Sequence, residues 1–550
     1  MAHFLTILEV SQKQAYIFSS NSLKDNVTNS AVIAWVMSPK YFSDTVNQKE
    51  IFDEEKNIVY SGGGHVVLEF ENEETARTFV KIVTFQIRSE YPGIEVFSVT
   101  REYDQQKLDK EPGKCLKDLT ANLERKKSVR LASFHQGTFG IEEIDSKTLD
   151  PKLVGNYKND EMPKQEREIE KKLSPDEKKQ VDEFRKLGGS KDKSNFIAVV
   201  HIDGNAMGKR VENIYKNSSL SWNEFKKHLQ EFSKTIDDDF KAAYKEMTNE
   251  VESNLKSGTL KELKLNDNDF PVRRIITAGD DICFVAEGRI GIECAVSFIK
   301  ALTKKKNKVD KTGYAACAGV AIVHQKYPFY RAYELAESLC SNAKRFGAKW
   351  SSDGSGSDIS AIDWHIEFGE MGDSLDEIRQ QYQTPDGRLE MRPYIVTVTE
   401  EEPEKEKQNG WNSILEKEPV RQYSNFKKLV NRVQNNEIIY ARGKMKELRN
   451  ALKQGERTAE SFVYFNKMED VMLENLQENT YHCDQIASGE GLERKLFIKI
   501  KEGKNDSTDG EKHSVIFDAL EICDTYIGFK EERQWKLEWN CYQMRFLETG

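Results

Sequence analysis

Residues 272–287 read VRRIITAGDDICFVAE. The runs 272–277 and 282–286 are rich in the β-branched and aromatic residues that strands favour. Between them, Ala278-Gly279-Asp280-Asp281 has the composition of a tight turn. The stretch therefore predicts a β-hairpin with two acidic residues at its tip.

The segments around this hairpin predict a complete folding unit. An apolar run at 196–202 predicts a strand, and a long helical region begins at Trp222. After the hairpin, apolar residues at helical spacing over 290–302 precede a strand-like run at 314–323. The order β-α-β-β-α-β is that of the ferredoxin-like fold, so we expect the α+β class.

The same order occurs earlier in the chain, which indicates an internal duplication. The predicted elements are a strand at 3–10, a helix through 31–36, strands at 58–60 and 66–70, a helix over 76–87 and a strand at 94–99. Aligning the two hairpins places Ser61-Gly62-Gly63-Gly64-His65 on residues 277–281 and Val10-Ser11 on Asp203-Gly204. In this alignment only the second copy carries acidic residues at both places.

The domain organisation follows from the two units, because 550 residues exceed what a single hydrophobic core usually holds. We expect a first unit at 1–103 and a second unit at 195–370. Between them, 104–194 is crowded with Lys and Glu and predicts a helical insert with a charged linker. The mostly helical pattern of 371–550 predicts a C-terminal helical domain.

Composition excludes several classes of protein. The net charge of -10 argues against a free-standing, non-specific nucleic-acid binder. No apolar run approaches membrane-spanning length and the start has no targeting pattern, so we expect a cytoplasmic protein without membrane contact. The eight cysteines are scattered without CxxC spacing, which favours buried reduced thiols over disulfides or a zinc site.

The acidic residues at the strand ends predict a metal-dependent phosphate chemistry. Mg²⁺ prefers oxygen ligands and is typically held by one or two carboxylates together with substrate phosphates. In the predicted unit the first strand neighbours the hairpin, so Asp203 can converge with Asp280 and Asp281. Gly204 and Gly279 would let phosphates approach the backbone, and the N–H groups of 205–208 could bind them. Either motif alone is equally typical of an ordinary turn.

Several motifs resemble one known family. They are Ile202-Asp203-Gly204-Asn205-Ala206-Met207-Gly208, Ala278-Gly279-Asp280-Asp281, 9–18, 61–64 and 318–328 with Ala336-Glu337 and Ala343-Lys344. Together they resemble the two palm domains of the large polymerase–cyclase subunit of type III CRISPR complexes, the Cmr and Csm large subunits. That family is related to the GGDEF diguanylate cyclases. The resemblance covers roughly residues 3 to 365.

The resemblance implies an activity. Two facing palms would bind two ATP molecules and make cyclic oligoadenylate or a related AMP-containing messenger when target RNA is bound. Mg²⁺ or Mn²⁺ would be the cofactor, and the partners would be the other subunits with guide and target RNA.

The resemblance also implies roles for single residues. The metal ligands would be Asp203 and Asp281, with Asp280 and the Ile202 carbonyl as further ligands. The nucleotide would be bound by Gly204, Asn205, Gly279 and Lys344. The acceptor would be held by the glycine turn of the first unit, Gly62, Gly63 and Gly64. Lys344 is equally typical of a solvated lysine, and the glycine triplet of a plain hairpin turn.

Three departures from the family pattern matter. The hairpin turn usually opens with two glycines, whereas Ala278 takes the first place here. No His is followed by Asp, so we expect no histidine–aspartate nuclease and no single-stranded DNA cleavage. Cys115 is the only cysteine before residue 283, so the zinc element of many members is missing.

Other polar groups have plainer interpretations. His201 shares a strand face with Asp203 and is expected to be a packed or partly exposed residue rather than a ligand. Asp237-Asp238-Asp239 is expected to be solvated charge on a helix. The basic runs 125–127 and 304–306 are expected to be solvated faces.

Three alternatives to messenger synthesis stay open. One is a scaffold subunit that binds nucleotide without turning it over, which Ala278 would favour. Another is transfer of AMP to a non-nucleotide acceptor, and the third is a cyclase that acts without guide RNA. The helical C-terminal part favours docking onto partner subunits over the last of these.

Overall fold

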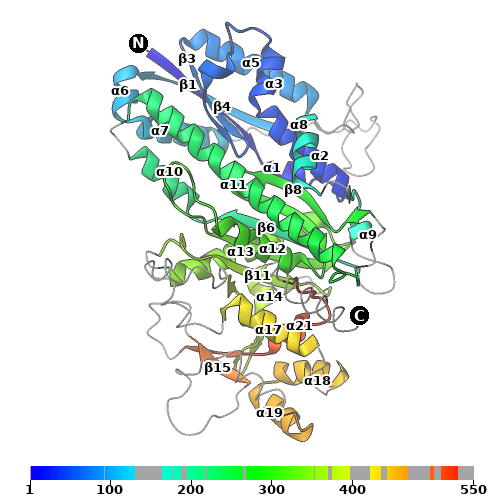
Figure 1. The fold of residues 1–550 in the computed structure, drawn as a ribbon. Helices are drawn as coiled ribbons and strands as arrows, with labels where there is room; N and C mark the ends of the chain where they lie inside the picture. The colour runs from blue at the N-terminus through cyan, green and yellow to red at the C-terminus, as the bar shows by residue number, and fades with distance from the viewer. Residues whose placement is uncertain are drawn as a thin grey trace, which may run out of the picture.

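The first unit is a four-stranded sheet, drawn in blue in Figure 1 of the computed structural model. Its order is β2-β3-β1-β4, and all neighbouring strands pair antiparallel. The elements are β1 (Ala2–Ser11), α1 (Lys13–Ile17), α2 (Leu23–Val36), α3 (Pro39–Val46), α4 (Glu54–Asn57), β2 (Ile58–Gly62), β3 (His65–Phe70), α5 (Glu73–Glu90) and β4 (Glu95–Asp104). The predicted element order is therefore present, with β4 running one residue past the expected boundary at 103.

Local sequence explains the helix α5. The Asn72 side chain caps its first turn by accepting from the Thr75 N–H, and Glu73 and Glu74 favour the same end through the helix dipole. Ala76, Phe79, Val83 and Ile87 recur at helical spacing and are all buried.

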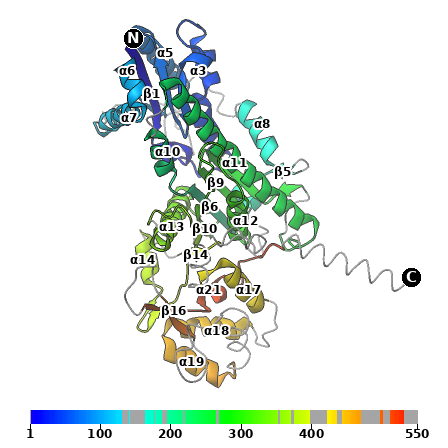
Figure 2. The same cartoon turned by 60° about the vertical axis from the view of Figure 1, so that its left-hand side comes forward.

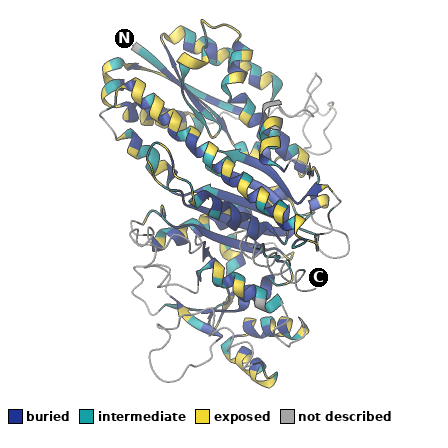
Figure 3. Ribbon diagram, viewed as in Figure 1, coloured by how far each residue is buried: buried dark blue, intermediate teal, exposed yellow. Residues whose placement is uncertain are grey.

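The second unit is a six-stranded sheet in the order β14-β11-β10-β6-β9-β8. Its elements are β6 (Phe196–Gly204), α10 (Met207–Tyr215), α11 (Trp222–Lys256), β7 (Asp269–Phe270), β8 (Val272–Ala278), β9 (Asp281–Glu287), α12 (Gly291–Thr303), β10 (Ala316–His324), α13 (Phe329–Trp350) and β11 (Ala361–Ile366). The strand β6 pairs antiparallel with β9 and β10, and it is buried along nearly its whole length (Figure 3). The α+β class is confirmed.

The helix α11 joins the two units. It runs diagonally across the molecule and contacts β2 in the first sheet and β8 in the second (Figure 1). Ser221 and Glu224 form a capping box at its start, and the Trp222 indole N–H donates to Glu69 of β3 at 3.0 Å. Phe18 of the first unit also packs on Tyr333 of α13, with ring centroids 4.2 Å apart. The two units therefore share one hydrophobic core.

The segment between the units contains helices that pack against the first sheet. Its elements are α6 (Gln105–Lys110), α7 (Pro112–Ser128), α8 (Lys164–Leu173), β5 (Lys179–Gln180) and α9 (Phe184–Leu187). The helix α7 packs on β4 and β1. The two-residue strand β5 pairs with β7 of the second unit.

The C-terminal part contains a sheet that the sequence did not predict beside its helices. Besides α14 (Leu375–Gln380), α17 (Tyr423–Gln434), α18 (Arg442–Lys453), α19 (Glu456–Phe465) and α21 (Phe517–Ile522), this part contains a four-stranded sheet, β12-β13-β16-β15 (Figure 2). Its strands are β12 (Gln383–Thr384), β13 (Gly387–Arg388), β15 (Phe497–Ile500) and β16 (Glu511–Ser514). The strand β14 (Tyr394–Ile395) joins the second sheet through β11.

The structure describes residues 2–91, 93–129, 141, 164–175, 178–187, 195–216, 220–263, 265, 268–351, 354–369, 374–396, 421–434, 442–468, 496–500 and 510–530. Among the helices within these ranges, none has the length and apolar character needed to cross a membrane.

Candidate active site

The three predicted acidic residues meet where β6 ends and the β8–β9 hairpin turns. Asp203 lies directly opposite Asp281 in the antiparallel pair of β6 and β9. The Gly204 N–H donates to the Asp280 carbonyl at 3.2 Å. Directly opposed residues share a sheet face with Cβ atoms about 4.5–5.5 Å apart, so the Asp203 and Asp281 carboxylates emerge side by side.

Burial and mutual repulsion raise the carboxyl pKa values. For Asp281, burial and then the charges of Asp203 and Glu337 raise the pKa to about 7. For Asp280, burial and then Asp203 raise the pKa to about 6. The Asp281 Oδ1 atom is buried and makes no hydrogen bond. An oxygen of this kind is ready to accept a cation.

Lys344 of α13 brings a positive charge to the same place. Its Nζ lies 2.6 Å from Asp203 Oδ2 and donates to the Gly204 carbonyl at 3.1 Å. Burial lowers the pKa of Lys344, but the Asp203 carboxylate outweighs this and holds the pKa above its ordinary value. Lys344 is thus a member of the site rather than a solvated lysine.

The donor set fits a divalent cation. Asp203 and Asp281 present hard carboxylate oxygens on one face, and one of these oxygens makes no hydrogen bond. Within the described residues, no three His, Cys, Asp or Glu side chains are already gathered around one point. Mg²⁺ commonly takes only one or two carboxylates and completes its shell with water and phosphate, so two suffice.

The Asn205 side chain has a structural role, while the metal-ligand role expected of the Ile202 carbonyl stays a prediction. The Asn205 side chain is buried, and its amide donates to the carbonyls of Gly356 at 3.0 Å and Ile359 at 2.7 Å. It fixes a loop beside the sheet and is not directed at a nucleotide. The Ile202 side chain is fully buried, paired between Ile282 and Ala318 in the ladder.

Glycine is needed at two predicted positions for different reasons. At Gly204 an added Cβ would lie 3.0 Å from the Asp280 Cβ and 3.1 Å from Phe240, so the strand end packs closely there. Gly279 has a φ of +65°, which favours glycine. Ala278 is not among the residues with positive φ, so its methyl group fits the turn without strain.

The glycine turn of the first unit repeats this geometry. Gly62 pairs with His65 as Ala278 pairs with Asp281, and Gly63 has a φ of +59° where Gly279 has +65°. The Lys13 ammonium donates to the Gly63 carbonyl. Burial lowers the pKa of Lys13, while the charges of Glu9 and Asp281 act in the other direction. Lys13 therefore contacts the glycine turn of the first unit and is close enough to the second turn to be affected by the Asp281 charge.

The register corrects the alignment of the two copies by one residue. Glu9, not Val10, lies opposite His65, and the Val10 N–H donates to the Gly64 carbonyl at 3.1 Å as Gly204 does to Asp280. The left-handed residues Gln12 (φ 51°) and Ala206 (φ 56°) both come three positions after the acid. Glu9 is thus the counterpart of Asp203, and the first copy does carry a carboxylate at this strand end.

Each unit also has a lysine that pairs with the carboxylate at the end of its first strand. Lys127 of α7 lies 3.0 Å from Glu9, and Lys344 of α13 lies 2.6 Å from Asp203. Each helix follows the last strand of its β-α-β-β-α-β unit. Glu9 opens the motif 9–18 and Lys127 ends the basic run 125–127, but the sequence did not predict that they pair, because this needs the register. Lys127 is therefore not simply part of a solvated face.

Comparison with known proteins gives the family. Residues 196–351 match the family model described as Cas10/Cmr2, second palm domain. This part of the chain is therefore similar to a Cas10/Cmr2 second palm domain. For these residues, the match bears out the resemblance to the second palm of the Cas10/Cmr2 family.

Solved structures and curated sequences were also compared. The crystal structure of the Csm1-Csm4 cassette in complex with cA3 is 14% identical with a TM-score of 0.41, covering 62% of this chain and 53% of that chain. The cassette with pppApA is 14% identical with a TM-score of 0.42, covering 77% and 63%. The chain thus spans about half the length of the first of these chains. No curated protein sequence matches.

The helix α11 contacts both glycine turns, which the sequence did not predict. Asp237 Oδ1 accepts from the Gly279 N–H of the second palm at 3.4 Å. One helical turn earlier, Ser233 hydrogen-bonds Tyr60, and an added Cβ at Gly62 would lie 3.2 Å from its hydroxyl. Asp239 accepts from the Tyr314 hydroxyl at 2.9 Å. The interpretation of 237–239 as merely solvated charge is therefore wrong for Asp237 and Asp239.

His201 has the packing role that was expected. Its ring is buried against Tyr333 in an edge-on contact, and its Nδ1 lies 3.5 Å from Asp281 Oδ1 without a hydrogen bond. Burial lowers the pKa of His201, so the ring is neutral at pH 7.

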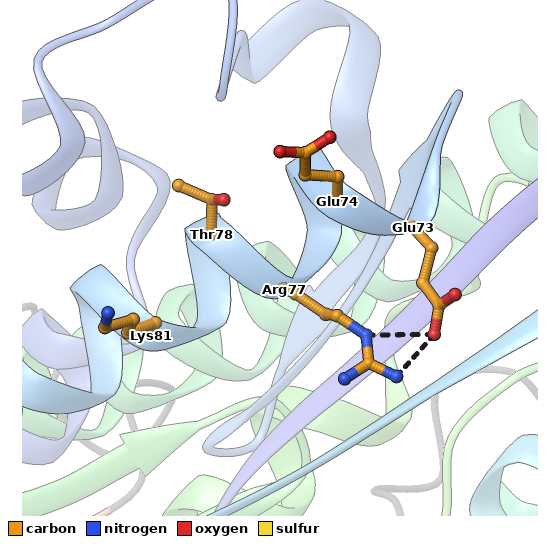
Figure 4. Close-up of a pocket in the computed structure, with 5 residues that line it drawn as sticks. All are labelled: Glu73, Glu74, Arg77, Thr78 and Lys81. Atoms are coloured by element: carbon orange, nitrogen blue, oxygen red, sulfur yellow. Dashed lines mark hydrogen bonds and ion pairs between the residues drawn. The ribbon is translucent and has the colours of Figure 1, made fainter.

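A surface hollow on α5 is unrelated to the second palm. It is lined by Glu73, Glu74, Arg77, Thr78 and Lys81, with Arg77 paired to Glu73 at 2.7 Å (Figure 4). All five residues lie on one helix, and the lining includes none of the predicted site residues.

Proposed function

We propose that the chain is an ATP-dependent nucleotidyltransferase of a type III CRISPR complex, making a cyclic oligoadenylate or related AMP-containing messenger when target RNA binds. The observation that carries this is the direct opposition of Asp203 and Asp281 in a Cas10/Cmr2 second palm. In this proposal residues 1–103 and 195–370 are ferredoxin-like palms. The insert at 104–194 and the part from 371 to 550 serve contacts with partner subunits, guide RNA and target RNA.

The reaction would be attack of a ribose hydroxyl of one adenosine on the α-phosphate of ATP. A new P–O bond forms, the bond to the β-phosphate breaks, and pyrophosphate leaves with the proton passing to solvent. Mg²⁺ or Mn²⁺ held by Asp203 and Asp281 would activate the hydroxyl and neutralise the pyrophosphate. Asp280 supports the turn beside them.

The chain's other groups would orient the substrates. Lys344 supplies positive charge for the triphosphate, and α10 starts after Ala206 without a side-chain cap, which leaves N–H groups for phosphate. The Gly62–Gly64 turn of the first unit would hold the acceptor, with Lys13 beside it.

The test is pyrophosphate release by the assembled complex with ATP, target RNA and Mg²⁺ or Mn²⁺. Asp203→Ala with Asp281→Ala should lower the rate by at least about 10²-fold, because the cation loses both carboxylates. Glu73→Ala with Glu74→Ala on the exposed face of α5 is the control and should leave the rate unchanged. Unchanged products from the Asp203/Asp281 variant would show that the assigned site is wrong.

The Lys344–Asp203 ion pair favours one competing function, a subunit that binds nucleotide but is silent. In that case ATP binds to the complex, yet pyrophosphate is not released with any target RNA. The same assay, combined with a measurement of ATP binding, separates the two functions.

A further inference from the structure

The Lys344 ammonium is bound as a metal ion would be. Its contacts are a carboxylate oxygen, Asp203 Oδ2 at 2.6 Å, and a backbone carbonyl oxygen, that of Gly204 at 3.1 Å. Both are hard oxygen donors of the kind Mg²⁺ and Mn²⁺ select. A lysine ammonium is a compact point charge, so it is a suitable stand-in for such an ion.

The Lys344 ammonium contacts only one of the two opposed carboxylates, that of Asp203. Asp281, directly across the sheet from Asp203, retains a buried oxygen without a hydrogen bond. A divalent ion placed between the two side chains would contact both carboxylates. The lysine contacts one, so the arrangement with Lys344 is the weaker of the two.

The first unit has an equivalent lysine–carboxylate pair, but there a divalent ion would gain little by replacing the lysine. Lys127 binds Glu9 at 3.0 Å and also Glu124 at 2.8 Å, and His65 takes the place of Asp281. Without a second carboxylate opposite, Glu9 offers a divalent ion little more than it offers the lysine. Lys127 is therefore a matched control for Lys344.

We propose that Lys344 occupies the place of the divalent cation in the nucleotide-free protein and leaves it when the cation arrives with the triphosphate. The inference rests on the proposed function for the identity of the triphosphate. The lysine masks the acidic pair until its ammonium can move to a phosphate. Metal and nucleotide then bind together, each favouring the other.

The test is Mn²⁺ binding to the purified full chain, followed by the electron paramagnetic resonance signal of the free ion. Without nucleotide, Lys344→Met should bind Mn²⁺ on the order of tenfold more tightly than the wild type, because the competing cation is gone. Lys344→Arg, which keeps the charge, should bind as weakly as the wild type, and Lys127→Met should change nothing. With a non-hydrolysable ATP analogue, the advantage of Lys344→Met should disappear.

Equal or weaker Mn²⁺ binding by Lys344→Met without nucleotide would overturn the inference, as would Mn²⁺ binding by neither protein. The readout does not depend on turnover. If the complex releases no pyrophosphate but Lys344→Met binds Mn²⁺ more tightly, the proposed function fails and the inference stands. A circular dichroism melt confirms that each variant is folded.

Discussion

Ionisation of Asp281 destabilises the folded protein, so the stability should depend on pH through this residue. Its pKa of about 7 lies above the ordinary value of 3.8, so the folded protein binds this proton more tightly than the unfolded chain does. The resulting stability is complete below pH 3.8 and is lost as the pH rises through about 7. The Asp281 side chain is 39% exposed, so solvent screens part of this effect. In metal-free protein at pH 8, Asp281→Asn should therefore raise Tm, by about 2 °C.

A melting series from pH 4 to pH 8 checks the sign, because the gain from Asp281→Asn should vanish at the acidic end. Mn²⁺ should stabilise the wild type more than the variant. Asp203→Asn is the matched control: its carboxylate is already paired with Lys344, so removal of its charge should not stabilise the protein. A gain in Tm from Asp281→Asn over the wild type that is larger at pH 4 than at pH 8 would contradict the electrostatic account.

The sequence predicted the position of a site residue where a short motif marks it. Asp203 and Asp280 stand next to glycines at strand ends, Asp281 follows Asp280, and the strands bring the three together as expected. Glu9 was missed because strand alternation does not reveal the register of two copies, and a slip of one residue put Val10 in its place. Asn205 follows the motif, but its side chain turns to a loop more than 150 positions away.

The β8–β9 hairpin gives a prediction at the scale of an element. Gly279→Ala should cost roughly 1–2 kcal/mol of unfolding free energy, because a φ of +65° disfavours any Cβ although nothing lies within 4 Å of it. The rate of pyrophosphate release should also fall, because the substitution displaces the turn that carries Asp280 and Asp281. Urea unfolding and the pyrophosphate assay measure the two effects.

Ala278→Gly is the control in the same turn. Because Ala278 lacks a positive φ, restoring the usual family glycine should change stability by less than about 1 kcal/mol and leave the rate unchanged. A large gain in rate from Ala278→Gly would mean that the methyl group does impair the turn.

Elements with a clear period were predictable, and short ones were not. The helices and strands of both units follow from apolar spacing, as in α5. The C-terminal sheet escaped prediction because β12 and β13 have two residues each, too few to show alternation. β13 also pairs with β16 across more than 120 positions, which no local pattern encodes.

At the scale of the whole molecule, a buried carboxylate ties the C-terminal part to the second palm. Glu293 of α12 accepts from the hydroxyls of Tyr423 and Tyr526, from Lys427 at 2.7 Å and from the Phe529 N–H at 2.9 Å. Glu293→Leu leaves the Lys427 charge unpaired and should cost about 3–5 kcal/mol. Hydrogen exchange over 421–434 and 517–529 should accelerate, while that of the first unit should not.

The exposed pair Lys446–Asp524, 3.5 Å apart, serves as the control for Glu293. Lys446→Ala should change stability by at most about 1 kcal/mol, because solvent screens this pair. Equal acceleration of exchange in both variants would show that Glu293 does not hold the C-terminal part in place.

The two contacts that α11 makes with the glycine turns have a consequence for how reactants are spaced. Ser233 meets the Gly62 turn and Asp237 meets the Gly279 turn, one helical pitch of about 5.4 Å apart on a continuous rod. The distance between the two glycine turns is thus set by the backbone of the helix. A one-residue insertion between 233 and 237 would rotate the rest of α11 by about 100°. It would move Asp237 off its turn together with the buried face of the helix that includes Phe240 and Tyr244, so spacing and folding are coupled through this helix.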